Sequence, residues 1–171
     1  MTCNNCGAAM RLENGKDYFT CDFCKNICVP EPDADGLRIL GEAASLNCPI
    51  CRLPLVHAAA GPCRLLACER CRGVLASMEM FVALVQHLRS QYDGPADAER
   101  PPEPTDLERK IRCPQCGDTF DTHFYAGPGN VVIDNCPRCG LNWLDHLELR
   151  RIVRAPDRQY NEEGWLPPED R

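Results

Sequence analysis

Residues 113–149 read CPQCGDTFDTHFYAGPGNVVIDNCPRCGLNWLDHLEL, and they carry the pattern that decides the fold. Two CxxC pairs lie at the ends of a stretch that is typical of a β-hairpin, with DTHFY and VVIDN as strands around the turn GPGN. A CxxC turn directs two thiolates at one point, so a hairpin between two such turns brings four sulfurs together. We therefore expect this stretch to form a zinc ribbon.

The same pattern occurs twice more in the chain of 171 residues, and twelve of the 14 cysteines fall into six CxxC pairs. The gaps between consecutive pairs hold 14, 23, 16, 41 and 19 residues, so the first, third and fifth gaps have the length of a hairpin. These gaps define three quartets: Cys3, Cys6, Cys21 and Cys24; Cys48, Cys51, Cys68 and Cys71; Cys113, Cys116, Cys136 and Cys139. The expected fold class is a set of small metal-stabilised modules, three four-cysteine zinc ribbons that bind three Zn²⁺ ions, because zinc supplies the folding free energy that modules of about 30 residues lack.

Two other chemistries use the same thiols. Iron in a rubredoxin-like site takes four thiolates as well, and ligand type does not separate it from zinc. Thiol redox motifs occur once in a βαβ unit, whereas here the pairs recur on hairpins, so redox catalysis is disfavoured. Four-cysteine sites leave no open coordination position, and the four histidines form no recognisable triad, so no catalytic residue is predicted. Cys28 and Cys63, which lie outside the pairs, are expected to be small buried thiols, with Cys28 as a substitute ligand in the alternative.

The repeat gives a domain map. In ribbon one, Asn14-Gly15 is a strong hairpin signal, and in ribbon two PLVHA and CRLLA lie around Gly61-Pro62. The segment after ribbon two is rich in proline and acid, which predicts an extended spacer that lets ribbon three move independently. The expected units are zinc ribbon 1 (1–29), an acidic linker (30–45), zinc ribbon 2 plus helix (46–91), a Pro-rich acidic linker (92–110), zinc ribbon 3 plus helix (111–155) and a flexible tail (156–171).

Ribbons two and three are each followed by apolar residues at helical spacing. In the first of these helices Ser77 is a good N-cap, and the apolar positions are Phe81, Leu84, Val85 and Leu88. In the second, Asp145 and Glu148 are placed like a capping box, and the apolar face comprises Leu149, Ile152 and Val153. We expect each helix to pack on its own ribbon.

Composition and charge indicate the environment of the chain. The formal net charge is −6, and three filled sites lower it to about −12, because each adds four thiolates and one Zn²⁺. The N-terminus has no apolar run of signal-peptide length, so the thiols should stay reduced in the cytoplasm. The longest apolar stretch, 74–88, is interrupted by polar residues, so no membrane association is expected.

Ribbon three, CPQCG…NCPRCGLNWLDHLELRRI, resembles the bacterial zinc-ribbon domains related to transcription factor IIB, whose second knuckle runs into a CxxCxGxWLDxxEL-like motif. The matching residues are Trp143, Leu144, Asp145, Glu148 and Leu149, while Leu141 stands where the family has glycine. Ribbon two is similar to a diverged copy that keeps Gly73 but has Leu75, Ala76 and Ser77 in place of WLD. The resemblance implies zinc binding and leaves the partner open.

Three functions compete. The leading hypothesis is a non-catalytic adaptor for protein–protein interaction, attached to transcription or another macromolecular machine, because the sites are closed and the chain is acidic. The second is nucleic-acid binding through basic side chains, the candidates being Arg64, Arg70, Arg72, Arg150, Arg151 and Arg154. The third is a thiol-redox or chaperone-like role. In the tail, Trp165-Leu166 is either a docking peptide or a segment packed on the last helix.

Overall fold

The N-terminal ribbon forms a small sheet of its own. The computed structural model describes residues 1–13, 15–98, 101, 104–127, 129–156, 160–161 and 164–165. Strands β1 (Met10–Leu12), β2 (Phe19–Cys21) and β3 (Ile27–Cys28) form a three-stranded antiparallel sheet in the order β1-β2-β3. Of the predicted turn Asn14-Gly15, Asn14 lies outside the described residues and Gly15 has a φ of 70°. The hairpin of ribbon one is confirmed on either side of this turn.

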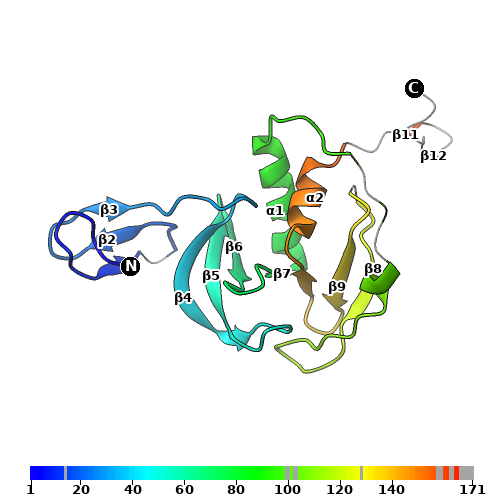
Figure 1. Cartoon of the computed structure of the whole chain (residues 1–171), viewed down its shortest axis with the longest axis horizontal. Helices are drawn as coiled ribbons and strands as arrows, with labels where there is room; N and C mark the ends of the chain where they lie inside the picture. The colour runs from blue at the N-terminus through cyan, green and yellow to red at the C-terminus, as the bar shows by residue number, and fades with distance from the viewer. Residues whose placement is uncertain are drawn as a thin grey trace.

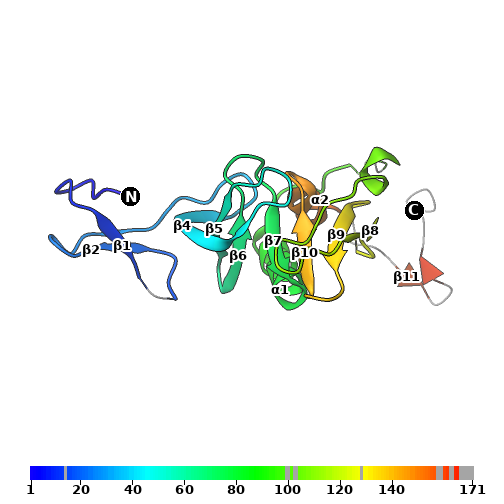
Figure 2. The same cartoon turned by 90° about the horizontal axis from the view of Figure 1, so that it is seen from below.

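Ribbons two and three share one seven-stranded antiparallel sheet. Its strands follow the order β4-β5-β6-β7-β10-β9-β8, which Figure 2 shows from left to right. The predicted hairpins are β5 with β6 and β8 with β9. The strands of this sheet are β4 (Arg38–Asn47), β5 (Pro54–Ala60), β6 (Cys63–Ala67), β7 (Val74–Ser77), β8 (Asp121–Phe124), β9 (Val132–Cys136) and β10 (Leu141–Leu144).

The two halves of the large sheet meet at β7 and β10. These strands follow the last zinc knuckle of their own ribbon, and they pair antiparallel with each other. In the register Leu75 lies opposite Trp143, and each is the fourth residue after the last cysteine of its ribbon. Equivalent residues that face each other place a pseudo-two-fold axis between these strands, so the two ribbons are arranged like the halves of a symmetric dimer.

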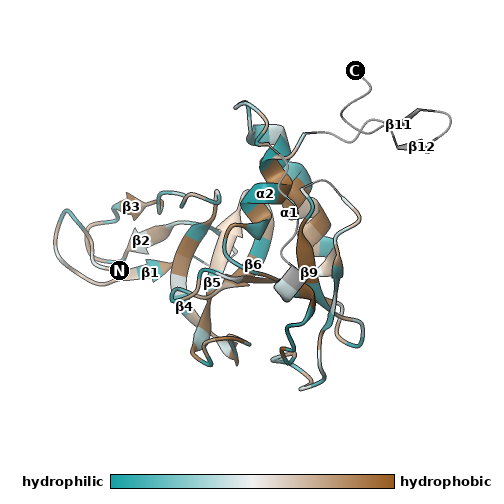
Figure 3. Ribbon diagram, turned by 45° about the vertical axis from the view of Figure 1, so that its right-hand side comes forward, coloured by the Kyte–Doolittle hydropathy of each residue, from teal (hydrophilic) through white to brown (hydrophobic). Residues whose placement is uncertain are grey.

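Two helices cover one face of this sheet. Helix α1 (Met78–Gln91) and helix α2 (Glu148–Arg154) lie next to each other in Figure 1. Ser77 caps α1 as predicted, because its side chain accepts a hydrogen bond from the backbone N–H of Met80 at 3.2 Å. All four predicted apolar residues of α1 are buried, together with Leu149 and Ile152 of α2. The apolar residues between helices and sheet form one core, toward which the hydrophobic colour gathers in Figure 3.

The start of α2 differs in detail from the prediction. The Glu148 carboxylate accepts the backbone N–H of Asp145 at 2.6 Å, which is one half of the expected capping box. The Asp145 side chain, however, is bound elsewhere, and the helix starts after Leu147, which has a left-handed φ of 75°. The reciprocal half of the capping box is therefore missing.

Two predicted linkers contain ordered structure. Residues 38–47, most of which fall in the predicted acidic linker, form β4 at the edge of the large sheet, because Leu37 and Leu40 find buried positions there. In the second predicted linker, Pro104–Leu107 is a short 3₁₀ helix, and the N–H of Asp97 donates to the carbonyl of Arg154 at 2.8 Å. In the structure ribbon three is tied to ribbon two through the shared sheet rather than separated from it by an extended spacer.

Ribbon one lies against the β4 edge of the large sheet and extends away from it (Figure 1). Phe19 of ribbon one packs with Leu40 and Ala59 of the sheet in a small separate cluster. The Arg38 guanidinium donates to the Asp17 carboxylate at 3.2 Å, and both side chains are partly exposed. This contact is small compared with the core that joins ribbons two and three. In the tail, β11 (Tyr160–Asn161) pairs with β12 (Gly164–Trp165), while Leu166 of the predicted docking pair lies outside the described residues.

Candidate metal centres

Each of the six CxxC turns adopts one backbone geometry, here called a knuckle and taken to include the residue after the second cysteine. That residue has a φ between 59° and 80° in all six cases. Its N–H donates to the carbonyl of the first cysteine at 2.8–3.0 Å, which closes the turn. The six residues are Gly7, Lys25, Arg52, Arg72, Gly117 and Gly140. The positive φ explains why glycine follows the cysteine in three knuckles, since glycine adopts this conformation without steric cost.

The twelve predicted cysteines come together in three groups of four. Within each group the sulfur atoms all lie within 4.8 Å of one another, and none of the cysteines forms a disulfide. The shortest separations are 3.5 Å in ribbon one and 3.6 Å in ribbons two and three. A tetrahedron with Zn–S bonds of about 2.3 Å has edges of about 3.8 Å, which is close to these separations. The three groups are suited to three Zn²⁺ ions, as the cysteine spacing predicted.

Hydrogen-bond donors lie near some of the sulfurs, while burial and the neighbouring thiols raise the pKa of others, such as Cys139 to about 12. The backbone N–H of Cys51 points at Cys48 Sγ at 3.2 Å, and the side-chain amide of Asn26 lies 3.9 Å from Cys3 Sγ. In ribbon one the side chain of Asn5 and then the backbone N–H of Asn26 lower the pKa of Cys24 to about 6. Such hydrogen bonds stabilise the charged sulfur that a metal requires and orient it. When bound, zinc supplies the structural crosslink between the two knuckles of a ribbon.

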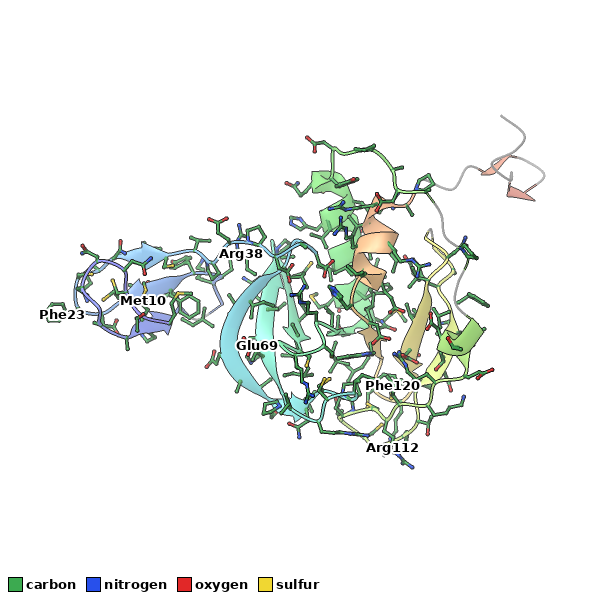
Figure 4. The ribbon with its side chains drawn as sticks, in the orientation of Figure 1. Met10, Phe23, Arg38, Glu69, Arg112 and Phe120 are labelled. Atoms are coloured by element: carbon green, nitrogen blue, oxygen red, sulfur yellow. The ribbon has the colours of Figure 1, made fainter. Side chains whose placement is uncertain are left out.

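The sites of ribbons two and three share one hydrophobic core. This core lies at the zinc end of the sheet and includes Leu75, Phe120 and Trp143 together with cysteines of both ribbons. Figure 4 shows Phe120 at this end of the molecule. The site of ribbon one is not part of this core and lies beside its own small cluster. The structure therefore joins two metal sites in one packing unit and leaves the third apart.

The WLD stretch of ribbon three forms contacts inside the fold. Trp143 is fully buried, and its indole N–H donates to the Asp145 carboxylate at 3.0 Å. Arg109 bridges that carboxylate to Asp134, which is 1% exposed and also accepts the Thr122 hydroxyl at 2.6 Å. Arg109 is not among the residues predicted from the sequence, although an acid in the apolar run VVIDN is a signal that a basic partner exists. These contacts hold ribbon three together.

Glu148 is a second buried acid in the same network. It is 8% exposed, and burial raises the pKa of its carboxyl to about 8, with the nearby Asp145 adding to the shift. The hydrogen bond from the backbone of Asp145 acts in the opposite direction. The carboxyl of the WLDxxEL-like motif is thus a buried group with a structural role.

Half of the predicted basic residues are bound within the chain. Arg64 donates to three backbone carbonyls, of which Gly15 in ribbon one is 3.1 Å away. Arg151 donates to the carbonyl of Asn130 at 3.0 Å, and Arg154 stacks over the ring of Tyr92 at 5.0 Å. The six arginines therefore do not act as one basic surface.

The other predicted basic residues are exposed or lie near acids. Arg70 is exposed, and Arg72 borders a cavity of ≈ 440 Å³ together with Asp35 and His146. Arg150 also acts electrostatically on the Asp35 carboxyl, whose pKa is raised chiefly by burial. Of the two cysteines outside the quartets, Cys63 is buried as predicted and Cys28 is partly buried.

These observations define a protein built from three four-cysteine zinc ribbons, two of them fused into one sheet. Residues 112–155 match the family model Zn_ribbon_TFIIB, described as transcription factor zinc-finger, so ribbon three with its helix is a zinc ribbon of this family. No curated protein and no solved structure gives a significant match to the chain. Among the described residues, the helices are too short or too polar for any of them to span a lipid bilayer.

Proposed function

We propose that this protein is a non-catalytic zinc adaptor that binds a protein partner, with a role related to transcription. The observation that carries the proposal is the closure of its metal sites. Each group offers four thiolates, which complete the tetrahedral shell of zinc and leave no position for a substrate or water. The twelve cysteines are then structural ligands, and the working surfaces are the exposed side chains that the knuckles present.

The family match supports the link to transcription at residues 112–155. A protein partner is favoured over nucleic acid because the net charge is −6 before metal binding and because Arg64, Arg151 and Arg154 are held within the chain. Proteins that coat phosphate backbones present continuous basic surfaces, which this arrangement does not.

The test is affinity purification of the tagged, zinc-loaded chain from its own cells, in parallel with a Cys51→Ser, Cys116→Ser variant. We expect a stoichiometric protein partner with the parent chain and its loss with the variant, because the knuckles of ribbons two and three lose their crosslinks. Recovery of nucleic acid alone, or no difference between the two baits, would contradict the proposal.

A further inference from the structure

The zinc end of ribbon two carries an unusual set of exposed side chains. In its first knuckle Ile50 and Leu53 are 41% and 44% exposed, and Arg52 between them is exposed as well. In its second knuckle Arg70 and Arg72 are also exposed. We call these five residues the basic knuckle surface: Ile50, Arg52, Leu53, Arg70 and Arg72. Glu69, labelled in Figure 4, is an exposed acidic residue next to Arg70 in the chain.

Arg52 and Arg72 occupy backbone positions that suit glycine. Their φ angles are 63° and 59°, and the equivalent residues of ribbon three are Gly117 and Gly140. A side chain in this left-handed region costs about 1 kcal/mol or more, and such strain collects at functional sites. Ribbon two therefore has arginine at two positions where a side chain costs conformational free energy. The glycines of ribbon three avoid this cost.

The arginine side chains of this surface make few contacts within the molecule. Among the described residues, the side chains of Arg52 and Arg70 form no hydrogen bond or ion pair, and the Arg72 side chain interacts only electrostatically, with Asp35. Lys25, at the matching position in ribbon one, instead donates to the carbonyl of Asp22 at 2.8 Å.

Neutralising the thiolates of the metal site does not explain these arginines. Ribbon three has the same four thiolates with glycine at both positions. Arg138, which stands where ribbon two has Arg70, is paired with Asp118 at 3.3 Å. Within the described part of the chain, the side-chain charges of Arg52 and Arg70 are therefore exposed and unpaired.

We propose that the basic knuckle surface docks an acidic segment of a partner protein that also carries aliphatic residues. This deepens the proposed adaptor function and rests on it. The guanidinium groups match carboxylates in bidentate pairs, while Ile50 and Leu53 give apolar contacts beside them. Nucleic acid fits less well, because residues 46–77 contain no Phe, Tyr or Trp on which a base can stack.

The experiment measures binding of a fluorescein-labelled peptide of Asp-Asp-Leu repeats to the full, zinc-loaded chain by fluorescence anisotropy. The expected result is saturable binding that weakens as salt is added, with about tenfold lower affinity for Arg70→Glu. The matched control is Arg138→Glu, the equivalent residue of ribbon three. This substitution should change the affinity by less than about twofold, which is within experimental error. Arg52→Gly should also weaken binding while the zinc content stays at three and the melting temperature does not fall.

Several outcomes would overturn this inference. They are an equal loss of peptide affinity with Arg70→Glu and Arg138→Glu, equal binding of a peptide in which Asn replaces Asp, no binding of the Asp-Asp-Leu peptide, or loss of zinc from the Arg52→Gly variant. Tighter binding of a DNA oligonucleotide, lost with Arg70→Glu, would assign the surface to nucleic acid instead. If the Arg70→Glu chain still retains its cellular partner, the docking surface is wrong while the adaptor function stands.

Discussion

Gly73→Ala, which adds a single methyl group, should disrupt the packing between the two halves of the large sheet. A Cβ at this position would lie 2.1 Å from Cζ2 and 2.7 Å from Cη2 of Trp143, whereas ordinary contacts start at 3.4 Å. The indole must therefore move by more than an ångström. It has no free space, because Trp143 is fully buried and its N–H is bound to Asp145.

We expect Gly73→Ala to lower the free energy of unfolding by about 3–4 kcal/mol. Overpacking contributes about 2 kcal/mol, and loss of the hydrogen bond to the carboxylate contributes about 1–2 kcal/mol. Because Gly73 does not have a positive φ, the alanine itself is conformationally allowed, and the cost arises from the contact with Trp143. The measurement is urea denaturation followed by circular dichroism in zinc-containing buffer.

A double-mutant cycle isolates the contact. Trp143→Leu introduces the residue that ribbon two has at the equivalent position, Leu75, and removes the ring that clashes. In that background Gly73→Ala should cost less than about 1 kcal/mol, which gives a coupling energy of about 2 kcal/mol or more. Gly140→Ala serves as the control, since its Cβ meets no atom within 4 Å and only its φ of 62° opposes it. Additive effects of the two substitutions would refute the reasoning.

Three further outcomes follow from the metal sites, the buried acid and the attachment of ribbon one. Cys51→Ser should reduce the bound zinc from three ions toward one, because sites two and three share a core. Cys6→Ser should remove one ion only. Elemental analysis measures the zinc content of both variants. In the folded state the Glu148 carboxyl keeps its proton up to its pKa of about 8, whereas in the unfolded chain it releases the proton near pH 4.5. The free energy of unfolding should therefore fall by about 2 kcal/mol between pH 6 and pH 8. Glu148→Gln should abolish that fall in thermal melts, and an unchanged slope would contradict the assignment. Phe19→Ala should free ribbon one from the sheet without loss of its zinc, seen as faster proteolysis between residues 28 and 38.

The knuckle surface shows how side chains and backbone conformation must be considered together. The sequence alone places Arg70 and Arg72 in a set of six basic residues that does not include Arg52. The structure divides that set, because Arg64, Arg151 and Arg154 find partners in distant segments of the chain. Only the φ angles reveal that arginine at position 52 is strained.

What the sequence determined by itself is local. Three hairpins with four thiols each follow from the six CxxC pairs, their spacing and the turn residues between them. Ser77 is likewise sufficient to start α1. These features can be predicted because they depend on neighbours along the chain. The tertiary structure decided how the ribbons are joined. Pairing of Leu75 with Trp143, the close approach of the indole to Gly73 and the bridge from Arg109 to Asp134 all depend on residues far apart in sequence, which no local pattern records.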